Sequence, residues 1–217
     1  MVKPLYSDAG SGVIFNLAGE IQIGQDVLPE GVILLPINKQ TQNIVLAAGS
    51  QLAGIRFLPA MGYGVLGQHF EKPTLLLPEH DQLYRLYQIY SELRILKDHD
   101  KQIKALYLWA ERNLTATHLI PSSLQRVLEC IEQDEALGHL NENVALSQRQ
   151  IERLFKRWLG MTPQHYQRIL RIKKAVSFLR QHNKVNLADV SLQFGFSDQA
   201  HMTREFRAIA STTPGQI

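Results

Sequence analysis

The chain is poor in the features that several classes of protein require. Its single cysteine, Cys130, excludes an internal disulfide and a cysteine-rich zinc site, and the apolar neighbours Val127, Leu128 and Ile131 predict a buried or half-buried, unreactive thiol. No run of 18 apolar residues occurs, and the first ten residues lack the apolar core of a signal peptide. These absences favour a soluble, cytoplasmic protein with no membrane partner.

Metal-binding side chains are not grouped in the sequence. The four histidines between residues 69 and 118 are isolated from one another, whereas a catalytic metal site on strands needs clustered histidine and carboxylate ligands. We therefore expect no metal, no cofactor and no enzymatic activity, and we assign no catalytic residue.

Acidic residues are scarce over one long stretch. The whole chain has a net charge of +3, but residues 147–184 hold 10 basic residues and one acid, Glu152. Residues 1–120, by contrast, hold 10 basic and 11 acidic residues. Concentrated basic charge is expected of a surface that contacts phosphates, although an ordinary solvated surface can also carry it. The charge pattern therefore favours nucleic acid as the partner of the C-terminal half.

The spacing of apolar residues changes along the chain. From Gly12 to about Lys72, short segments rich in Val and Ile are broken by Gly and Pro, which is typical of strands in a small barrel or sandwich. From Pro78 to about Leu114 the spacing becomes helical. The expected fold class is α+β, with a β-rich sensing or dimerisation domain and its C-terminal helices over residues 1–118, and an all-α domain over residues 119–217.

Two features of the N-terminal half leave alternatives open. A helical stripe is predicted at Leu83, Leu86, Tyr87, Tyr90 and Leu93. Either it packs on the chain's own sheet, or it or the neighbouring helix at 102–113 forms a two-fold dimer contact. Arg56 lies between two apolar residues of an expected strand, so it points to the opposite face. Inside a barrel, Arg56 would need a carboxylate from the protein or from an anionic effector; outside, it would be an ordinary surface residue.

A stretch of the C-terminal half occurs twice. "ALSQRQIERLFKRWLGMTP" at 145–163 is repeated in altered form as "GFSDQAHMTREFRAIASTTP" at 195–214. The retained pairs, 50 or 51 positions apart, are Ser147/Ser197, Ile151/Met202, Arg153/Arg204, Phe155/Phe206, Lys156/Arg207, Thr162/Thr213 and Pro163/Pro214. In the first copy the apolar residues at i, i+3, i+4 and i+7 predict one buried face, and the basic residues lie on another. Each copy therefore predicts a helix with a buried side and an outward polar side.

Capping residues predict where these helices begin. Ser147 with Gln150, and Ser122 with Gln125, fit the capping-box pattern. Thr162 followed by Pro163 predicts the start of a helix that runs to about Gln181. Further on, Asn186 and Ser197 are the expected N-caps of two helices that are separated by a tight turn at Gly195. A helix, a glycine turn and a second helix form the helix-turn-helix arrangement.

These residues resemble the DNA-binding domain of the AraC/XylS family of bacterial transcription regulators. Over residues 121–217 the resemblance rests on Ser147, Ile151, Arg153, Phe155 and Lys156 with Gly160 and Pro163, then on residues 195–199 with Met202, Arg204, Phe206 and Pro214. It implies two helix-turn-helix units, joined by the helix after Pro163, that each place their second helix in the major groove of DNA. Members of this family commonly carry a cupin-like module ahead of the DNA-binding half, and residues 1–118 resemble one weakly.

Two departures from the family pattern stand out. Ala145 replaces the usual glycine before the first recognition helix, and the preceding segment "EALGHLNENVA" contains Gly138 and two Asn, so we expect a short or distorted leading helix. The chain reaches Ile217 soon after Pro214, which leaves almost nothing of the family's final helix, so either the last turn is absent or the sequence ends early.

Side-chain chemistry divides the outward residues into two groups. The candidates for base contacts are Arg149, Gln150, Glu152, Arg153, Gln199, His201, Thr203 and Arg204. Glu152 either accepts from cytosine N4 or pairs with an arginine, and His201 either contacts a base or is a plain surface histidine. The candidates for phosphate contacts, with solvent as the alternative, are Lys156, Arg157, Thr162, Lys173 and Lys174.

The sequence thus predicts a regulator that binds double-stranded DNA. The helix from Thr162 to about Gln181 would be roughly 30 Å long, close to the ~34 Å turn of B-DNA, so two recognition helices could enter successive major grooves. Further candidate partners are a small-molecule effector, for which Arg56 is the candidate ligand residue, a second copy of the chain and, for an activator, RNA polymerase. The alternative is a module that binds a small ligand or a protein and whose DNA-binding half is degenerate.

Overall fold

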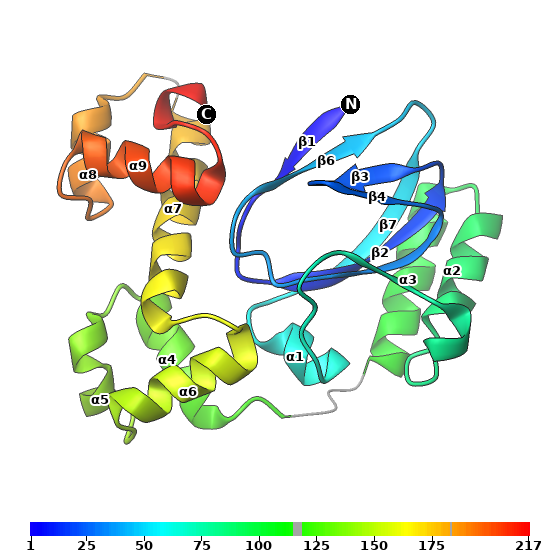
Figure 1. Cartoon of the computed structure of the whole chain (residues 1–217), viewed down its shortest axis with the longest axis horizontal. Helices are drawn as coiled ribbons and strands as arrows, with labels where there is room; N and C mark the ends of the chain where they lie inside the picture. Colours follow the sequence, from blue (N-terminus) through cyan, green and yellow to red (C-terminus); the bar gives the residue numbers. More distant parts are fainter. Residues whose placement is uncertain (115–118, 183) are drawn as a thin grey trace. The chain divides into compact units, whose positions relative to one another are not determined.

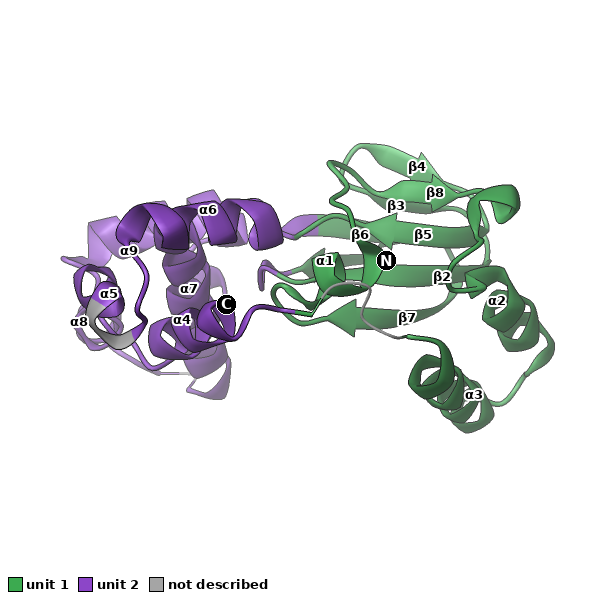
Figure 2. Cartoon of the chain, turned by 90° about the horizontal axis from the view of Figure 1, so that it is seen from below, with its two compact units in different colours: residues 1–5, 10–37, 43–119 green, residues 6–9, 38–42, 120–217 purple. Residues whose placement is uncertain are grey.

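The computed structural model describes residues 1–114, 119–182 and 184–217, and these form an α+β protein (Figure 1). The chain divides into two compact units (Figure 2). Unit 1 contains Met1–Leu5, Gly10–Ile37 and Asn43–Leu119, and unit 2 contains Tyr6–Ala9, Asn38–Gln42 and Ile120–Ile217. The expected domain boundary after residue 118 falls at residues 115–118, which lie outside the described residues. Unit 2 thus combines two short segments of the N-terminal half with the C-terminal helices.

Unit 1 is built on two open four-stranded sheets. One has the order β1-β6-β3-β4, with strands Val2–Leu5, Gln42–Leu46, Ile21–Ile23 and Asp26–Leu28. The other has the order β7-β2-β5-β8, with strands Gln51–Phe57, Ser11–Ala18, Gly31–Leu35 and Thr74–Leu76. The central strand β2 pairs antiparallel with both neighbours, so that Val13 lies opposite Leu34 and Ile55. Of the two expected architectures, the open sheets fit a sandwich and not a closed barrel.

The sheet that contains β2 is buried on both faces. Val13, Phe15 and Val32 pack with the helices α2 (Leu86–Ile95) and α3 (His99–Asn113). Ile33 lies in a second cluster with Ile21 and Ile44 of the other sheet. Because successive side chains of a strand point to opposite faces, a strand buried on both sides has a continuous apolar sequence, as in "GVILL" of β5.

The helical stripe at 83–93 packs on the chain's own sheet. Leu86, Tyr90 and Leu93 are buried in the same cluster as Phe15. Leu83 was wrongly included in the stripe, since it precedes α2 and is 65% exposed. A short helix, α1 (Met61–Leu66), was also not expected, because its glycines suggested strand bends.

Arg56 lies on the exposed side of β7. Its residue pairs with Gly12 of β2, and its Nη2 donates to the carbonyl oxygen of Gly10 at 3.1 Å. The Arg56 side chain is exposed, which fits the alternative of a surface residue and not that of a residue inside a barrel.

Unit 2 is helical apart from its two N-terminal segments. Its helices are α4 (Ser122–Glu132), α5 (Leu140–Asn143), α6 (Gln148–Leu159), α7 (Pro163–Gln181), α8 (Leu187–Gln193) and α9 (Gln199–Ala210), with 3-10 turns η2 at Leu137–His139 and η3 at Pro214–Gln216. The expected short leading helix is confirmed, because α5 has four residues. Cys130 of α4 is buried, and this burial raises the pKa of its thiol.

The capping predictions were right at three helices and wrong at two. Ser147 and Gln150 form the capping box of α6, Thr162 caps α7, and Asn186 caps α8. The box predicted at Ser122 and Gln125 is wrong, because α4 already includes Ser122 and its N-cap is Pro121. The N-cap of α9 is Asp198 and not Ser197; the Asp198 carboxylate accepts from the backbone N–H of His201.

Candidate nucleic-acid interface

The duplicated sequence forms two helices built to the same plan. Helices α6 and α9 each have 12 residues, and their first residues lie 51 positions apart. The buried side chains match one for one at this offset: Ile151/Met202, Phe155/Phe206, Trp158/Ile209 and Leu159/Ala210. Both helices end on a residue with left-handed backbone, Gly160 and Ser211. We call α5 with α6 the first motif, and α8 with α9 the second motif.

The outward face of α6 is strongly basic. Arg149, Arg153, Lys156 and Arg157 are all exposed. Glu152 is exposed as well, and its carboxylate accepts from the side-chain amide of Gln148 at 3.2 Å. This contact is to a neutral group of the same helix, so no basic residue of the face is paired with Glu152 by it, and the helix keeps a net charge of +3.

Gln150, a candidate for a base contact, also forms the capping box that the sequence predicted with Ser147. Its Oε1 accepts from the backbone N–H of Ser147 at 2.8 Å, which completes the capping box. The cap holds this oxygen at the helix start, and the Nε2 group is the part of the side chain that remains to donate to a base edge.

The outward face of α9 has fewer charges and more internal hydrogen bonds. Gln199 and Arg204 are exposed, whereas His201 and Thr203 are half-buried. The hydroxyl of Thr203 donates to the carbonyl oxygen of Gln199 at 2.9 Å, so its methyl group is the part available to a thymine methyl.

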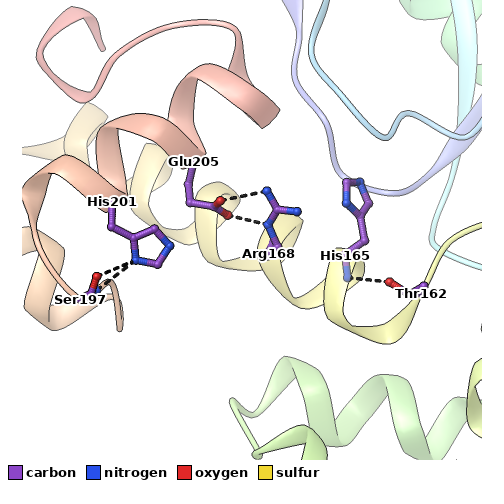
Figure 3. A network of polar contacts seen from close by, with 6 residues as sticks. All are labelled: Thr162, His165, Arg168, Ser197, His201 and Glu205. Atoms are coloured by element: carbon purple, nitrogen blue, oxygen red, sulfur yellow. Dashed lines mark hydrogen bonds and ion pairs between the residues drawn. The ribbon is translucent and has the colours of Figure 1, made fainter.

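His201 is oriented by the residue that precedes the cap. The backbone N–H of Ser197 donates to His201 Nδ1 at 3.2 Å (Figure 3). The His201 ring also lies edge-on to the Phe196 ring. Because Nδ1 accepts, the neutral ring carries its proton on Nε2. With Nδ1 held by Ser197, the group of the His201 ring that can donate is the Nε2–H.

A bidentate ion pair connects α9 to α7. Arg168 donates from Nε and Nη2 to the two carboxylate oxygens of Glu205, at 2.6 and 2.9 Å (Figure 3). Burial acts to raise the pKa of Glu205, but the hydrogen bonds and charge of Arg168 outweigh it and hold that pKa below its usual value. Sequence reasoning missed the pair, because two charges 37 residues apart on different helices leave no signal in spacing.

The candidates for phosphate contacts differ in whether an acidic group of the protein already lies beside them. Lys173 is exposed on α7. Its neighbour Lys174 instead lies 2.6 Å from the carboxylate of Asp134 and donates to the carbonyl oxygen of Glu132. Thr162 is exposed, and its hydroxyl accepts from the backbone N–H of His165 at 3.2 Å (Figure 3). Lys173 is therefore better placed than Lys174 to meet a phosphate.

Unit 2 also contains residues that sequence reasoning did not associate with the helices. The segments Tyr6–Ala9 and Asn38–Gln42, which we call the brace, contact the ends of both repeated helices. The backbone N–H of Thr41 donates to the carbonyl oxygen of Ile209 at 2.7 Å, and Lys39 Nζ donates to the carbonyl oxygen of Gly160 at 2.7 Å. Neither segment has a motif that would have revealed this role.

No group of three or more His, Cys, Asp or Glu residues in the described part of the chain could hold a metal ion. None of the helices described is both long enough and apolar enough to cross a membrane.

Comparison with known proteins supports the helix-turn-helix interpretation. Residues 140–217 match the family model described as a helix-turn-helix domain. The chain is 32% identical over 84 residues to the HTH-type transcriptional regulator ArgR of Pseudomonas aeruginosa, and 37% identical over 76 residues to the HTH-type transcriptional activator RhaS of Escherichia coli. These matches cover 39% and 35% of this chain, and 25% and 27% of the relatives, so the chain aligns with about a quarter of the length of the curated relatives it matches.

The fold of the chain is similar to that of a solved protein. ToxT from Vibrio cholerae, in a crystal structure bound to (E)-4-(8-methylnaphthalen-1-yl)but-3-enoic acid, aligns with a TM-score of 0.53 at 10% identity. The alignment covers 99% of this chain and 96% of ToxT. The expected architecture, a β-rich N-terminal part followed by a helical C-terminal part, is confirmed.

Proposed function

We propose that this chain, whose residues 140–217 match the model of a helix-turn-helix domain, is a sequence-specific transcription regulator of the AraC type that reads successive major grooves of DNA with α6 and α9. The observation that supports this most directly is the duplication of one helix design at an offset of 51 residues, with the same buried positions and with outward Arg153 and Arg204 at matching places. A duplicated surface on one chain fits a target that is itself repetitive.

The helix between the two motifs has a suitable length. Helix α7 has 19 residues, or roughly 28 Å at ~1.5 Å per residue, and it contacts both α6 and α9. Major grooves on one face of B-DNA recur every ~34 Å. The proposed base contacts are those of Arg149, Gln150, Glu152, Arg153, Gln199, His201, Thr203 and Arg204, and the proposed phosphate contacts are those of Lys156, Arg157, Thr162, Lys173 and Lys174.

The proposed activity is binding, without chemistry on a substrate, and it takes place in the cytoplasm. A selection of bound sequences from a random pool of duplex DNA, followed by gel-shift titration, tests it. We expect one enriched sequence with two separate conserved blocks. The rival function, a module whose DNA-binding half is degenerate, predicts no enriched sequence and an affinity that is equal for all duplexes.

A small-molecule effector is a second part of the proposal, since ToxT was crystallised with a carboxylic acid. Unit 2 holds a cavity of about 260 Å³ between the brace, α7 and α9. Its lining combines apolar Val176 and Ile209 with the cations Lys173 and Arg180, which suits a small carboxylate with an apolar body.

The effector proposal is tested by thermal shift with a panel of small carboxylates. Wild type is compared with Arg180→Gln and with Arg56→Ala. Stabilisation lost only in Arg180→Gln assigns the ligand to the cavity, and stabilisation lost only in Arg56→Ala assigns it to β7. A wild type that responds to none of the panel contradicts an effector of this class.

Self-association of unit 1 is the third part. On α3, Ile103 and Tyr107 lie four residues apart and are 67% and 69% exposed. Two antiparallel copies of α3 crossing near residue 107 would place Lys104 of each copy opposite Glu111 of the other. Sedimentation of the full chain should show a dimer that Tyr107→Glu converts to a monomer; a monomeric wild type at micromolar concentration contradicts this. An activator would in addition contact RNA polymerase.

A further inference from the structure

The brace is a small folded element with its own internal hydrogen bonds. Ser7 Oγ donates to the carbonyl oxygen of Asn38 at 2.6 Å, and Asn38 Nδ2 donates to the carbonyl oxygen of Tyr6 at 3.1 Å. The backbone N–H of Ser7 donates to Thr41 Oγ1 at 3.3 Å. Ser7 and Thr41 are both buried, so these bonds are shielded from competing water. The two segments therefore act as one piece.

This piece holds the end of α9 at two points. The N–H of Thr41 donates to the carbonyl oxygen of Ile209 at 2.7 Å, and the hydroxyl of Ser211 donates back to the carbonyl oxygen of Thr41 at 3.1 Å. The last carbonyl groups of a helix have no partner within the helix, so an outside donor both satisfies them and fixes the position of the helix end. The reciprocal pair fixes the orientation of α9 as well as its distance.

The same piece contacts the other two helices of the reading surface. Lys39 Nζ donates at 2.7 Å to the carbonyl oxygen of Gly160, the residue that caps the C-terminus of α6, where a cation is also favoured by the helix dipole. The guanidinium of Arg180 on α7 lies 4.5 Å from the centre of the Tyr6 ring. One element thus touches α6, α7 and α9.

We propose that Lys39 and Thr41 are positioning residues for DNA reading, which fix the separation and angle between the two recognition helices. The proposal rests on the proposed function and goes beyond it, because it assigns the choice of half-site spacing to residues outside the helix-turn-helix domain. By itself, helix α7 determines the distance between α6 and α9 but not the angle between them. The brace connects the C-terminal ends of α6 and α9, so the two helices cannot change their orientations independently when the spacing of the grooves changes.

The test compares duplexes that differ only in spacing. The starting probe is the duplex selected from the random pool, and the altered probe has one base pair inserted between its two conserved blocks. One base pair shifts the second block by ~3.4 Å and rotates it by roughly 35°. Wild type should lose about 30-fold or more in affinity, since each mismatched contact of a specific complex is costly.

The variant Lys39→Met/Ser211→Ala removes the bond that Lys39 of the brace donates to the end of α6 and the bond that Ser211 at the end of α9 donates to the brace, and it leaves the backbone bond from Thr41 to Ile209. It should lose less than about 5-fold on the inserted probe, because the two helices can then adjust separately. Lys39→Arg, which keeps a cationic donor, should behave like wild type. The control Lys72→Met/Ser91→Ala makes the same chemical changes on exposed residues of unit 1 and should also keep the wild-type ratio.

The readout separates positioning from folding and from the proposed function. A general loss of stability would lower affinity for both probes and leave their ratio unchanged, and the single variant Lys39→Met, at an exposed side chain, serves if the double variant does not fold. An equal ratio in variant and wild type overturns the proposal, and so does a wild type that tolerates the insertion. Failure of every protein to select a sequence would contradict the proposed function instead.

Discussion

Helices α6 and α9 share their length and their buried positions, and they differ in how they use charge. In α6, four basic residues and one acid give a net charge of +3 (4 − 1), whereas in α9, Arg204 and Arg207 against Glu205 give +1 (2 − 1). The acid of α6 contacts its own helix through Gln148, while the acid of α9 holds Arg168 of α7. Under the proposed function, we therefore expect the first motif to depend more on electrostatic attraction to DNA, and the second to depend more on a fixed orientation of its helix.

The turns before the two helices also differ. Gly195, which precedes α9, has φ of 71°, a left-handed conformation that glycine adopts without strain. Ala145, which stands where the family pattern has glycine before α6, is not among the residues with positive φ. The short leading helix α5 reaches α6 by a turn that does not need the left-handed conformation, and this explains why an alanine is tolerated there.

Removing the matched core residues should have the largest effect. Phe155→Ala and Phe206→Ala each empty a fully buried position and should lower the free energy of unfolding by about 3–5 kcal/mol. Denaturant titration of the full chain measures both. Leu192→Ala, at an exposed position of α8, is the control and should cost less than about 0.5 kcal/mol. Unequal losses at the two phenylalanines would show that the motifs are not equivalent in their cores.

The matched arginines come next. Arg153→Ala and Arg204→Ala should each cost about 1–3 kcal/mol on the selected duplex and relax base preference in one block only. Gel-shift titration against duplexes with single base changes identifies the block. Lys184→Ala, at an exposed residue outside both helices, should leave the preference intact. Equal weakening on the selected and on an unrelated duplex would reassign both arginines to phosphates.

The ion pair of the second motif should have a smaller effect that depends on pH. Arg168 and Glu205 have side-chain exposures of 36% and 14%, so Arg168→Met should cost about 1–2 kcal/mol, between the values for surface and buried pairs. The pKa of Glu205 is held below its usual value, so this contribution is present above the unfolded-state pKa of ~4.3 and is lost as pH falls through the folded-state pKa.

The measurement is a double-mutant cycle with Glu205→Gln, by urea unfolding at neutral pH and in acid. The coupling should be present at neutral pH and absent in strong acid. In DNA binding, Arg168→Met should weaken recognition of the second block alone. Equal weakening of both blocks would mean that the pair supports unit 2 as a whole.

The smallest expected difference separates two neighbours on the helix that joins the motifs. Lys173→Gln should reduce the slope of log affinity against log salt by about one unit, as for one phosphate contact. Lys174→Gln should change the slope less, because Asp134 already neutralises that lysine. Asp134→Asn would then make the Lys174 contribution visible, and equal slopes for the two lysine variants would contradict this division.

The sequence predicted the elements whose signal is local. The capping box at Ser147, the Thr162-Pro163 helix start and the apolar spacing of α6 each depend on residues within a few positions of one another, and each is confirmed. The N-cap of α9 was misplaced by one residue because Ser197 and Asp198 are both good caps in adjacent positions. The short strands β1 and β8 lie outside the stretch predicted to form strands, since four or fewer residues give too little alternation to detect.

Contacts between distant segments were not predictable in the same way. Arg168 and Glu205 were each visible as charged residues on a helix, but their pairing depends on how α7 and α9 cross. The bonds of Lys39 and Thr41 depend on two loops of the N-terminal half joining the helical unit. Nothing in the sequence around Lys39 distinguishes it from an ordinary surface lysine.

The discontinuity of unit 2 has a consequence for recombination between related genes. The chain enters and leaves this unit twice before residue 120, once between β1 and β2 and once between β5 and β6. A chimera joined near residue 120 therefore transfers a set of helices without nine residues that complete them, four from Tyr6–Ala9 and five from Asn38–Gln42. We expect an exchange of DNA specificity between such chains to succeed more readily when Tyr6–Ala9 and Asn38–Gln42 are transferred together with the helices.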